Sequence, residues 1–248
     1  MDLTLLILAY VAIGISTGFL SGLFGIGGGS VRIPLLAMTG MPLINAFATN
    51  MFAIPFSSGT GAYVQRKNIK WKISKYFIPG GVTGIVIATF LIGFVSSAFL
   101  AITFFLAALL TIPGLYLNQL SHKLYNKIKP TPRKYFSGAF LSNLIIGMRG
   151  GSGGTLFPPI LRAMHVEMHH AIATSLYTSL LTSLAALTLY IFRGDIIWVP
   201  AIIIAVTDVA GAYYGSKVSM KTKSKWLKAG LAITVFLLAC SVVYREFF

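Results

Sequence analysis

The chain has 248 residues, of which 56% are hydrophobic and only 10% are charged. Soluble domains of this length carry roughly 25% charged residues, so the composition excludes a water-soluble globular protein and predicts a single membrane domain over residues 1–248. The formal net charge of +15 does not favour nucleic-acid binding, because the basic residues gather in short segments between apolar runs and not on one continuous face.

Apolar runs long enough to cross a bilayer as helices recur along the whole chain. The first half contains Leu3–Phe24, Leu43–Val64, Ile73–Phe94 and Ala98–Leu117. The second half contains Tyr135–Met148, Met168–Phe192, Ile196–Ser216 and Trp226–Tyr244. A shorter apolar piece, Val31–Met38 or Leu156–Met164, lies between the first two runs of each half. The pattern predicts an all-α integral membrane protein with about eight transmembrane helices.

Three basic segments fix the expected topology. Each of Arg66–Lys75, Lys123–Lys134 and Lys217–Lys228 holds five of the twenty lysines and arginines, and such segments normally face the cytoplasm. If the eight long runs each crossed once, the third segment would lie on the opposite side from the other two. Broken or re-entrant helices at the start of each half remove this conflict. We therefore expect a multi-pass protein of the cytoplasmic membrane with all basic loops inside, and Asp2 and the Arg245–Glu246 pair outside.

The two halves of the chain are similar to each other in sequence. At an offset of 125 residues, nine of the 29 positions from Gly22 to Asn50 are identical, and at an offset of 127 the pairs Tyr63/Tyr190 and Trp71/Trp198 follow. The loop after the repeated tyrosine is strongly basic in the first half and nearly neutral in the second. The same unit is therefore expected in both orientations, as inverted-topology repeats of about 1–118 and 135–248 joined by a cytoplasmic loop of about 119–134.

Each repeat contains a glycine cluster at membrane depth, followed by Pro34 or Pro159. The clusters are Gly25-Ile26-Gly27-Gly28-Gly29-Ser30 and Gly150-Gly151-Ser152-Gly153-Gly154-Thr155. In hydrocarbon, non-helical backbone persists only where protein or a water-filled cavity satisfies its polar groups. A helix that restarts after such a break presents free N–H groups and its positive dipole end, which bind anions. The alternative is that these small residues only let helices pack closely.

At these residues the sequence resembles the TauE/SafE family of membrane transporters, the sulfite exporter family. The first half carries Gly18-x3-Gly22-x2-Gly25-x-Gly27-Gly28-Gly29, Pro34 and Ala46-x-Ala48-Thr49-Asn50. The second carries Gly147-x2-Gly150-Gly151-x-Gly153-Gly154, Pro159 and Ala171-x-Ala173-Thr174-Ser175. The resemblance implies transport of small sulfur-containing anions such as sulfite, sulfonates or sulfoacetate. Ser152 replaces the glycine that the first half has at Gly27.

Polar side chains near the breaks complete the candidate binding site. Arg32 follows the first break and Arg149 precedes the second, and a planar guanidinium can hold two oxygens of a sulfonate at once. Capping of helix ends or snorkelling to the interface is the structural alternative for both arginines. Hydroxyl and amide groups on the following helix could donate to the same anion or to neighbouring helices. These are Thr49, Asn50, Thr174 and Ser175.

Asp208 is the one acidic residue well inside a predicted span, which makes it a candidate for coupling to protons; a salt bridge to a buried arginine is the competing role. His165, His169 and His170 lack the further ligands that a metal site needs. We therefore expect no metal, no cofactor and no catalytic nucleophile. The sequence predicts a secondary transporter for a small anion in the lipid bilayer. An anion channel of similar architecture and a membrane-embedded enzyme remain as alternatives.

Overall fold

The computed structural model describes residues 3–92, 94–109 and 111–247, and within them the chain forms twelve α-helices, two 3₁₀ turns and no strand. Five of these helices are long and apolar enough to cross a bilayer. The predicted all-α class is therefore confirmed for the described residues. Asp2 and the side chains of Arg245 and Glu246, which the charge argument places outside, lie beyond the described part of the chain.

Most helices follow the predicted apolar runs, but the run Ala98–Leu117 is divided between the helices Ser97–Leu109 and Thr111–Leu120. Among the described residues, five helices rather than the expected eight are long and apolar enough to cross a bilayer. The first half forms α1 (Leu3–Phe24), α2 (Gly29–Met38), α3 (Leu43–Val64), η1 (Arg66–Asn68), α4 (Trp71–Leu91), α5 (Ser97–Leu109) and α6 (Thr111–Leu120). The second forms α7 (His122–Lys127), α8 (Pro132–Gly147), η2 (Gly153–Thr155), α9 (Phe157–Ala163), α10 (Met168–Arg193), α11 (Trp198–Lys221) and α12 (Ser224–Phe247). α8 begins three residues before its apolar run, because Thr131 accepts a hydrogen bond from Lys134 N and Pro132 occupies the first turn.

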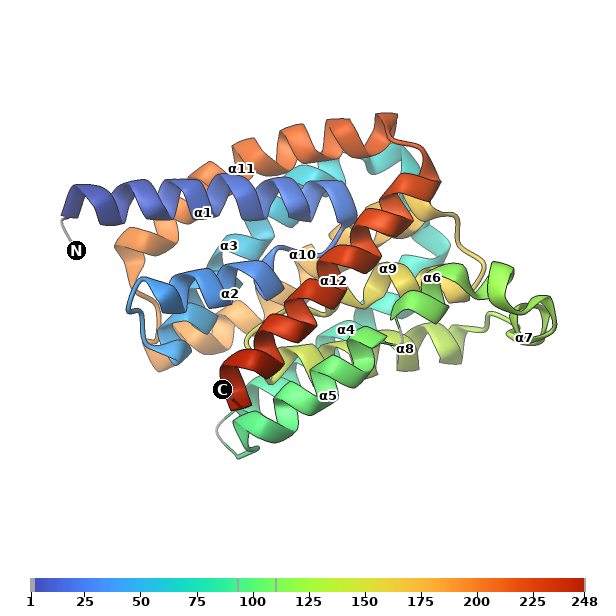
Figure 1. Cartoon of the computed structure of the whole chain (residues 1–248), viewed down its shortest axis with the longest axis horizontal. Helices are drawn as coiled ribbons and strands as arrows, with labels where there is room; N and C mark the ends of the chain where they lie inside the picture. Colours follow the sequence, from blue (N-terminus) through green and yellow to red (C-terminus); the bar gives the residue numbers. More distant parts are fainter. Residues whose placement is uncertain (1–2, 93, 110, 248) are drawn as a thin grey trace.

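Helices from the two halves pack in matching pairs (Figure 1). α1 lies along α11, and α8 lies along α4. In the internal repeat α1 corresponds to α8, and α4 corresponds to α11. α3 and α10 pack against each other, α3 also contacts α11, and α10 also contacts α4. α12 crosses α5 on the outside. These contacts between the halves therefore each have a counterpart with the roles of the halves exchanged, whereas the contact of α6 with α9 has none.

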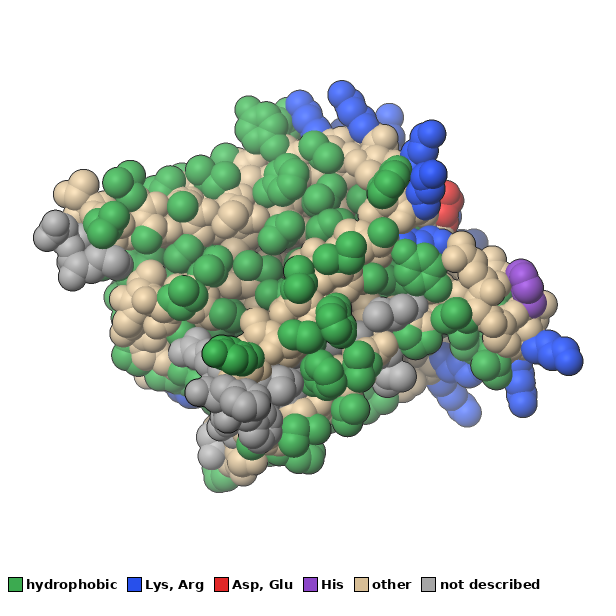
Figure 2. Space-filling model, viewed as in Figure 1, with side chains coloured by type: hydrophobic (Ala, Val, Ile, Leu, Met, Phe, Trp, Pro, Cys, Tyr) green, Lys and Arg blue, Asp and Glu red, His purple; other side chains and the backbone are tan. Residues whose placement is uncertain are grey.

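Histidines join the three basic segments at one end of the molecule. His170 Nδ1 lies 2.7 Å from Asn68 O, His169 Nε2 lies 3.1 Å from Thr222 O, and His165 Nε2 lies 2.8 Å from Tyr125 O. Figure 2 shows most of the visible lysine and arginine side chains toward the end opposite the N-terminus. The molecule therefore has one strongly basic end.

Glycines set the close approach of the two matching helix pairs. A Cβ added to Gly211 on α11 would overlap Ile15 O on α1, and one added to Gly84 on α4 would overlap Phe140 O on α8. These glycines correspond to each other at the offset of 127. Small residues of this kind let membrane helices approach backbone to backbone.

We predict that Gly211→Ala and Gly84→Ala each destabilise the protein, because the added methyl group meets a backbone oxygen that cannot move away. Overpacking of this kind costs about 1–3 kcal/mol. Thermal unfolding of the purified protein measures the loss. Gly59→Ala is the control, since its Cβ would lie 3.5 Å from the nearest side-chain atom and should leave the melting temperature unchanged. Equal melting temperatures for all three variants would contradict this packing.

Candidate functional site

The first glycine break lies between α1 and α2. Gly25, Gly27 and Gly28 adopt φ values of 75°, 70° and 74°, a region that residues with a Cβ rarely occupy. The chain turns there, and Val31 N and Arg32 N both donate to Gly28 O at the start of α2. Among the described residues, no acceptor is found for the N–H groups from Ile26 to Ser30. Consecutive free N–H groups at such a turn form a concave site that favours anions.

The second break lies between α8 and α9 and offers fewer free donors. Gly150 has a φ of 69°, and Gly153 N donates to Asn143 Oδ1. Pro158 and Pro159 occupy the first turn of α9, so that turn lacks two of the N–H groups that α2 supplies. Both breaks therefore contain a glycine with positive φ, but the second break has fewer free N–H groups with which to bind an anion.

The two breaks touch each other through equivalent residues. The hydroxyl oxygens of Ser30 and Thr155 lie 2.6 Å apart, and a Cβ added to Gly27 would lie 2.9 Å from Ser152 Oγ. Both pairs are separated by 125 residues, the offset of the internal repeat. A residue that contacts its own counterpart must lie near the axis that relates the halves. The breaks thus meet at the centre of the molecule.

Side chains of α3 and α10 tie each break to the opposite half. Asn50 Nδ2 donates to Gly150 O at 2.7 Å, and Ser175 Oγ donates to Gly25 O at 2.6 Å. Donors and acceptors correspond pair by pair at the same offset. These bonds satisfy carbonyl oxygens that the interrupted helices leave without helical partners.

Arg32 is fully buried and forms an ion pair with Asp208 on α11. Its Nε donates to Thr17 Oγ1 at 3.2 Å, and its NH1 group donates to Asn50 Oδ1 at 2.9 Å. Thr17 Oγ1 in turn donates to Asp208 Oδ1 at 3.1 Å. The competing structural role of Asp208, a salt bridge to a buried arginine, is therefore observed. The guanidinium holds α2 against α1, α3 and α11.

The remaining predicted site residues lie either beside the second break or against loops that connect helices. Arg149 is half-buried directly before Gly150, and a Cβ on Gly151 would press against Ile146 of α8. Thr49 and Thr174 lie away from the breaks, because Thr49 Oγ1 contacts Met41 Sδ at 3.7 Å and Thr174 Oγ1 accepts from Lys70 N at 3.0 Å. Both threonines thus face connecting loops.

The structure adds one polar residue that the sequence patterns did not single out, Ser179, beside the predicted Ser152. The hydroxyl groups of Ser152 and Ser179 are buried and have no hydrogen-bond partner among the described residues. A Cβ on Gly154 would lie 2.9 Å from Ser179 Oγ, which places this hydroxyl beside the meeting point of the breaks. Ser179 lies one helical turn after Ser175, so the spacing on α10 was the available signal.

The site is suited to an anion. Free backbone N–H groups and unpartnered hydroxyls meet there, while the nearby carboxylate, Asp208, is neutralised by Arg32. Within the described residues no group of three or more histidine, cysteine or acidic side chains could hold a metal ion. Such an arrangement is chemically suited to hold a small oxyanion, and the residues described at it include no paired acid and base of the kind that catalysis uses.

The chain matches the TauE/SafE sulfite exporter family over residues 10–242. It belongs to this family of membrane transporters. It is 23% identical to a probable membrane transporter protein, YunE, of Bacillus subtilis, over 96% of this chain and 97% of that protein. It is 24% identical to a probable membrane transporter protein of Haemophilus influenzae, over 96% and 98% respectively.

A third relative covers a shorter stretch. The probable membrane transporter protein MJ0441 of Methanocaldococcus jannaschii is 36% identical over 49% of this chain and 37% of that protein. Membership of the TauE/SafE family confirms the predicted resemblance and makes the chain a multi-pass membrane transporter, not an enzyme. The membrane-embedded enzyme considered from the sequence is thereby set aside.

We predict that removing one partner of the Arg32–Asp208 pair strongly destabilises the TauE/SafE protein. Arg32→Ala or Asp208→Ala leaves an uncompensated buried charge, which typically costs about 3–5 kcal/mol. The double variant should lose less than the sum of the two single losses, as measured by thermal or denaturant unfolding. Asp195→Ala is the control, because its pair with Arg193 is partly exposed and should contribute under about 1 kcal/mol. Additive losses would show that the two charges do not interact.

Proposed function

We propose that this TauE/SafE transporter moves a small sulfur-containing anion, such as sulfite, a sulfonate or sulfoacetate, across the cytoplasmic membrane by alternating access. The contact between the two glycine breaks carries the proposal. It combines free N–H groups from Ile26 to Ser30 with the buried hydroxyls of Ser152 and Ser179. A sulfonate or sulfite group has three oxygens around one sulfur and needs donors from several directions.

The transporter architecture we propose is two inverted repeats, about 1–118 and 135–248, with broken helices at their interface. Three observations support it. Helix pairs between the halves match with their roles exchanged. Equivalent residues such as Ser30 and Thr155 contact each other. α1 begins at the end away from the basic segments, whereas its counterpart α8 follows a basic segment. Substrate sites of such transporters lie where the repeats meet near the bilayer midplane.

We assign direct substrate contact to the first break and to residues beside the second. The N–H groups of Gly27, Gly28, Gly29 and Ser30 form the main anion cradle, with Thr155, Ser152 and the guanidinium of Arg149 on the opposite side. Arg32 acts as a positioning residue, because its donors are already directed at Asp208, Asn50 and Thr17. The shared basic end faces the cytoplasm, in keeping with the positive-inside rule.

Arg149→Ala is expected to abolish sulfoacetate binding and to leave folding intact, because a partly exposed arginine contributes more to anion recognition than to packing. Binding is measured by isothermal titration of the purified protein, and folding by its melting temperature. Arg193→Ala is the matched control, since this exposed arginine pairs with Asp195 far from the breaks. Unchanged affinity in Arg149→Ala would remove this residue from the site.

Counterflow distinguishes the transporter from a channel. Liposomes loaded with unlabelled sulfoacetate should accumulate labelled sulfoacetate transiently and with a saturable rate. Sulfite and taurine, tested as competitors, define the preferred headgroup. Ohmic currents in planar bilayers, with no counterflow, would show that the protein is an anion channel of the same architecture and not a transporter.

We further propose that Asp208 couples transport to protons, because it is a buried acid whose ion pair with Arg32 spans α2 and α11. Asp208→Asn retains hydrogen-bonding capacity but cannot carry a proton. Because the neutral amide also leaves the buried Arg32 charge uncompensated, the variant should melt at a lower temperature, and transport is measured below that temperature. The folded variant should keep counterflow and lose accumulation driven by a pH gradient. Identical gradient-driven accumulation in Asp208→Asn and the wild type would show that another group carries the coupling.

A further inference from the structure

Two buried apolar clusters lie on either side of the glycine breaks. The α2-side cluster consists of Tyr10, Ile13, Leu36, Met41, Ala46, Ala53, Ile204 and Ala205. The α9-side cluster consists of Phe77, Ala139, Phe157, Leu161, Val166 and Ala171. Each packs around one of the short helices that start at the breaks, and the members of each are buried.

The two clusters are built from equivalent positions of the internal repeat. Three pairs are related by the offset of 125 residues, and the fourth by the offset of 127. The pairs are Leu36/Leu161, Met41/Val166, Ala46/Ala171 and Ile204/Phe77. Leu36/Leu161 and Ala46/Ala171 are among the identities that set the offset of 125, but Met41/Val166 and Ile204/Phe77 are not, so their presence in the two clusters is an independent observation. The clusters are therefore one structural element present twice.

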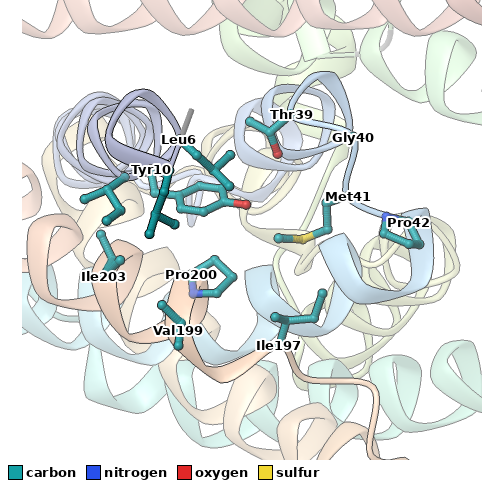
Figure 3. A pocket seen from close by; sticks show the side chains of 12 residues that line it. Leu6, Tyr10, Thr39, Gly40, Met41, Pro42, Ile197, Val199, Pro200 and Ile203 are labelled. Carbon is teal, nitrogen blue, oxygen red and sulfur yellow. The ribbon is translucent and has the colours of Figure 1, made fainter. Parts of the chain in front are cut away.

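The clusters lie toward opposite ends of the molecule. α2 runs from the centre toward the end that carries the N-terminus, where a cavity of about 470 Å³ reaches the α2-side cluster. Tyr10 and Met41 belong to both the cavity wall and the cluster, and Figure 3 shows their side chains pointing toward one another. α9 runs instead to the basic end, where the ring of His165 contacts that of Tyr125 of α7 in a tilted arrangement, with 4.1 Å between ring centroids.

The clusters differ in how they are held closed. Phe77 and Phe157 meet edge to face at 4.9 Å in the α9-side cluster. Phe157 occupies the position that Arg32 has in the first half, and Gly81 occupies that of Asp208. Aromatic packing therefore secures α9, whereas the buried ion pair secures α2. Each short helix can be released by weakening a different interaction.

We infer that the α2-side cluster and the α9-side cluster are the two gates that separate the anion site from the two sides of the membrane. The inference rests on the proposed transport function. A dry apolar layer excludes a small anion, because the anion would lose its hydration there. Transport then requires each cluster to open in turn. The cavity above Tyr10 and Met41 is the vestibule on the side away from the basic end.

Cysteine labelling tests the gates directly. In a Cys240→Ser background, Ala46→Cys reports on the α2-side gate and Ala171→Cys on the α9-side gate. Both alanines are fully buried, so a membrane-impermeant maleimide reaches the new thiols only when a gate opens. Ala48→Cys and Ala173→Cys are matched controls, because they are equally buried and equivalent but lie outside both clusters. These controls should stay unlabelled.

A second substitution shifts the balance between the gates. Phe157→Ala should raise labelling at Ala171→Cys several-fold from the basic side and lower labelling at Ala46→Cys from the other side. Ile204→Ala should do the reverse, because opening one gate depletes the state in which the other is open. Phe77→Leu replaces Phe157→Ala if that variant does not elute as a monodisperse species. Labelling that rises together at both positions, or changes at neither, would show that the two clusters are not the gates.

Counterflow of sulfoacetate in the same variants separates the two proposals. Reciprocal labelling without sulfoacetate counterflow would leave the gates standing and refute the proposed substrate. Counterflow with labelling that is not reciprocal would keep the proposed transport and refute these residues as its gates.

Discussion

The backbone in a bilayer has no water to satisfy its polar groups, and this constraint determines the centre of the TauE/SafE protein. Each interrupted helix leaves carbonyl and N–H groups without helical partners. The carbonyls find donors inside the protein, since Ser175 donates to Gly25 O and Asn50 donates to Gly150 O. The N–H groups from Ile26 to Ser30 do not find acceptors in the described chain. This surplus of donors over acceptors is the physical basis of the proposed anion site.

The same constraint explains why the breaks occur as a pair. A single non-helical segment at this depth would face lipid, whereas two segments related by the internal repeat cover each other. Contacts between equivalent residues, such as Ser30 with Thr155, lie near the axis that relates the halves. Around this common centre the halves have diverged. Arg32 of the first half and Asp208 of the second half form a buried ion pair, whereas the equivalent positions hold Phe157 in the second half and Gly81 in the first.

Much of the fold could be predicted from the sequence, because apolar runs and glycine clusters are local features. α1 and α3 coincide with their predicted runs, and both short helices follow the clusters that were expected to precede them. A salt bridge from Asp208 to a buried arginine was one of the two roles expected for it, but the sequence did not single out Arg32, which lies 176 residues away along the chain. Thr49 and Thr174 show a second limit. A neighbouring position on a helix points about 100° away, so the contacts of Asn50 and Ser175 do not extend to the threonines beside them.

Disulfide formation between the two breaks tests the central claim most directly. With Cys240→Ser as background, the Ser30→Cys, Thr155→Cys double variant should cross-link rapidly within one chain in native membranes under mild oxidation, because the two hydroxyls it replaces lie 2.6 Å apart. Saturating sulfoacetate should slow the reaction, since the anion would occupy the space between the breaks. Failure to cross-link would contradict the meeting of the two interrupted helices. Cross-linking at a rate that sulfoacetate leaves unchanged would contradict an anion site between them.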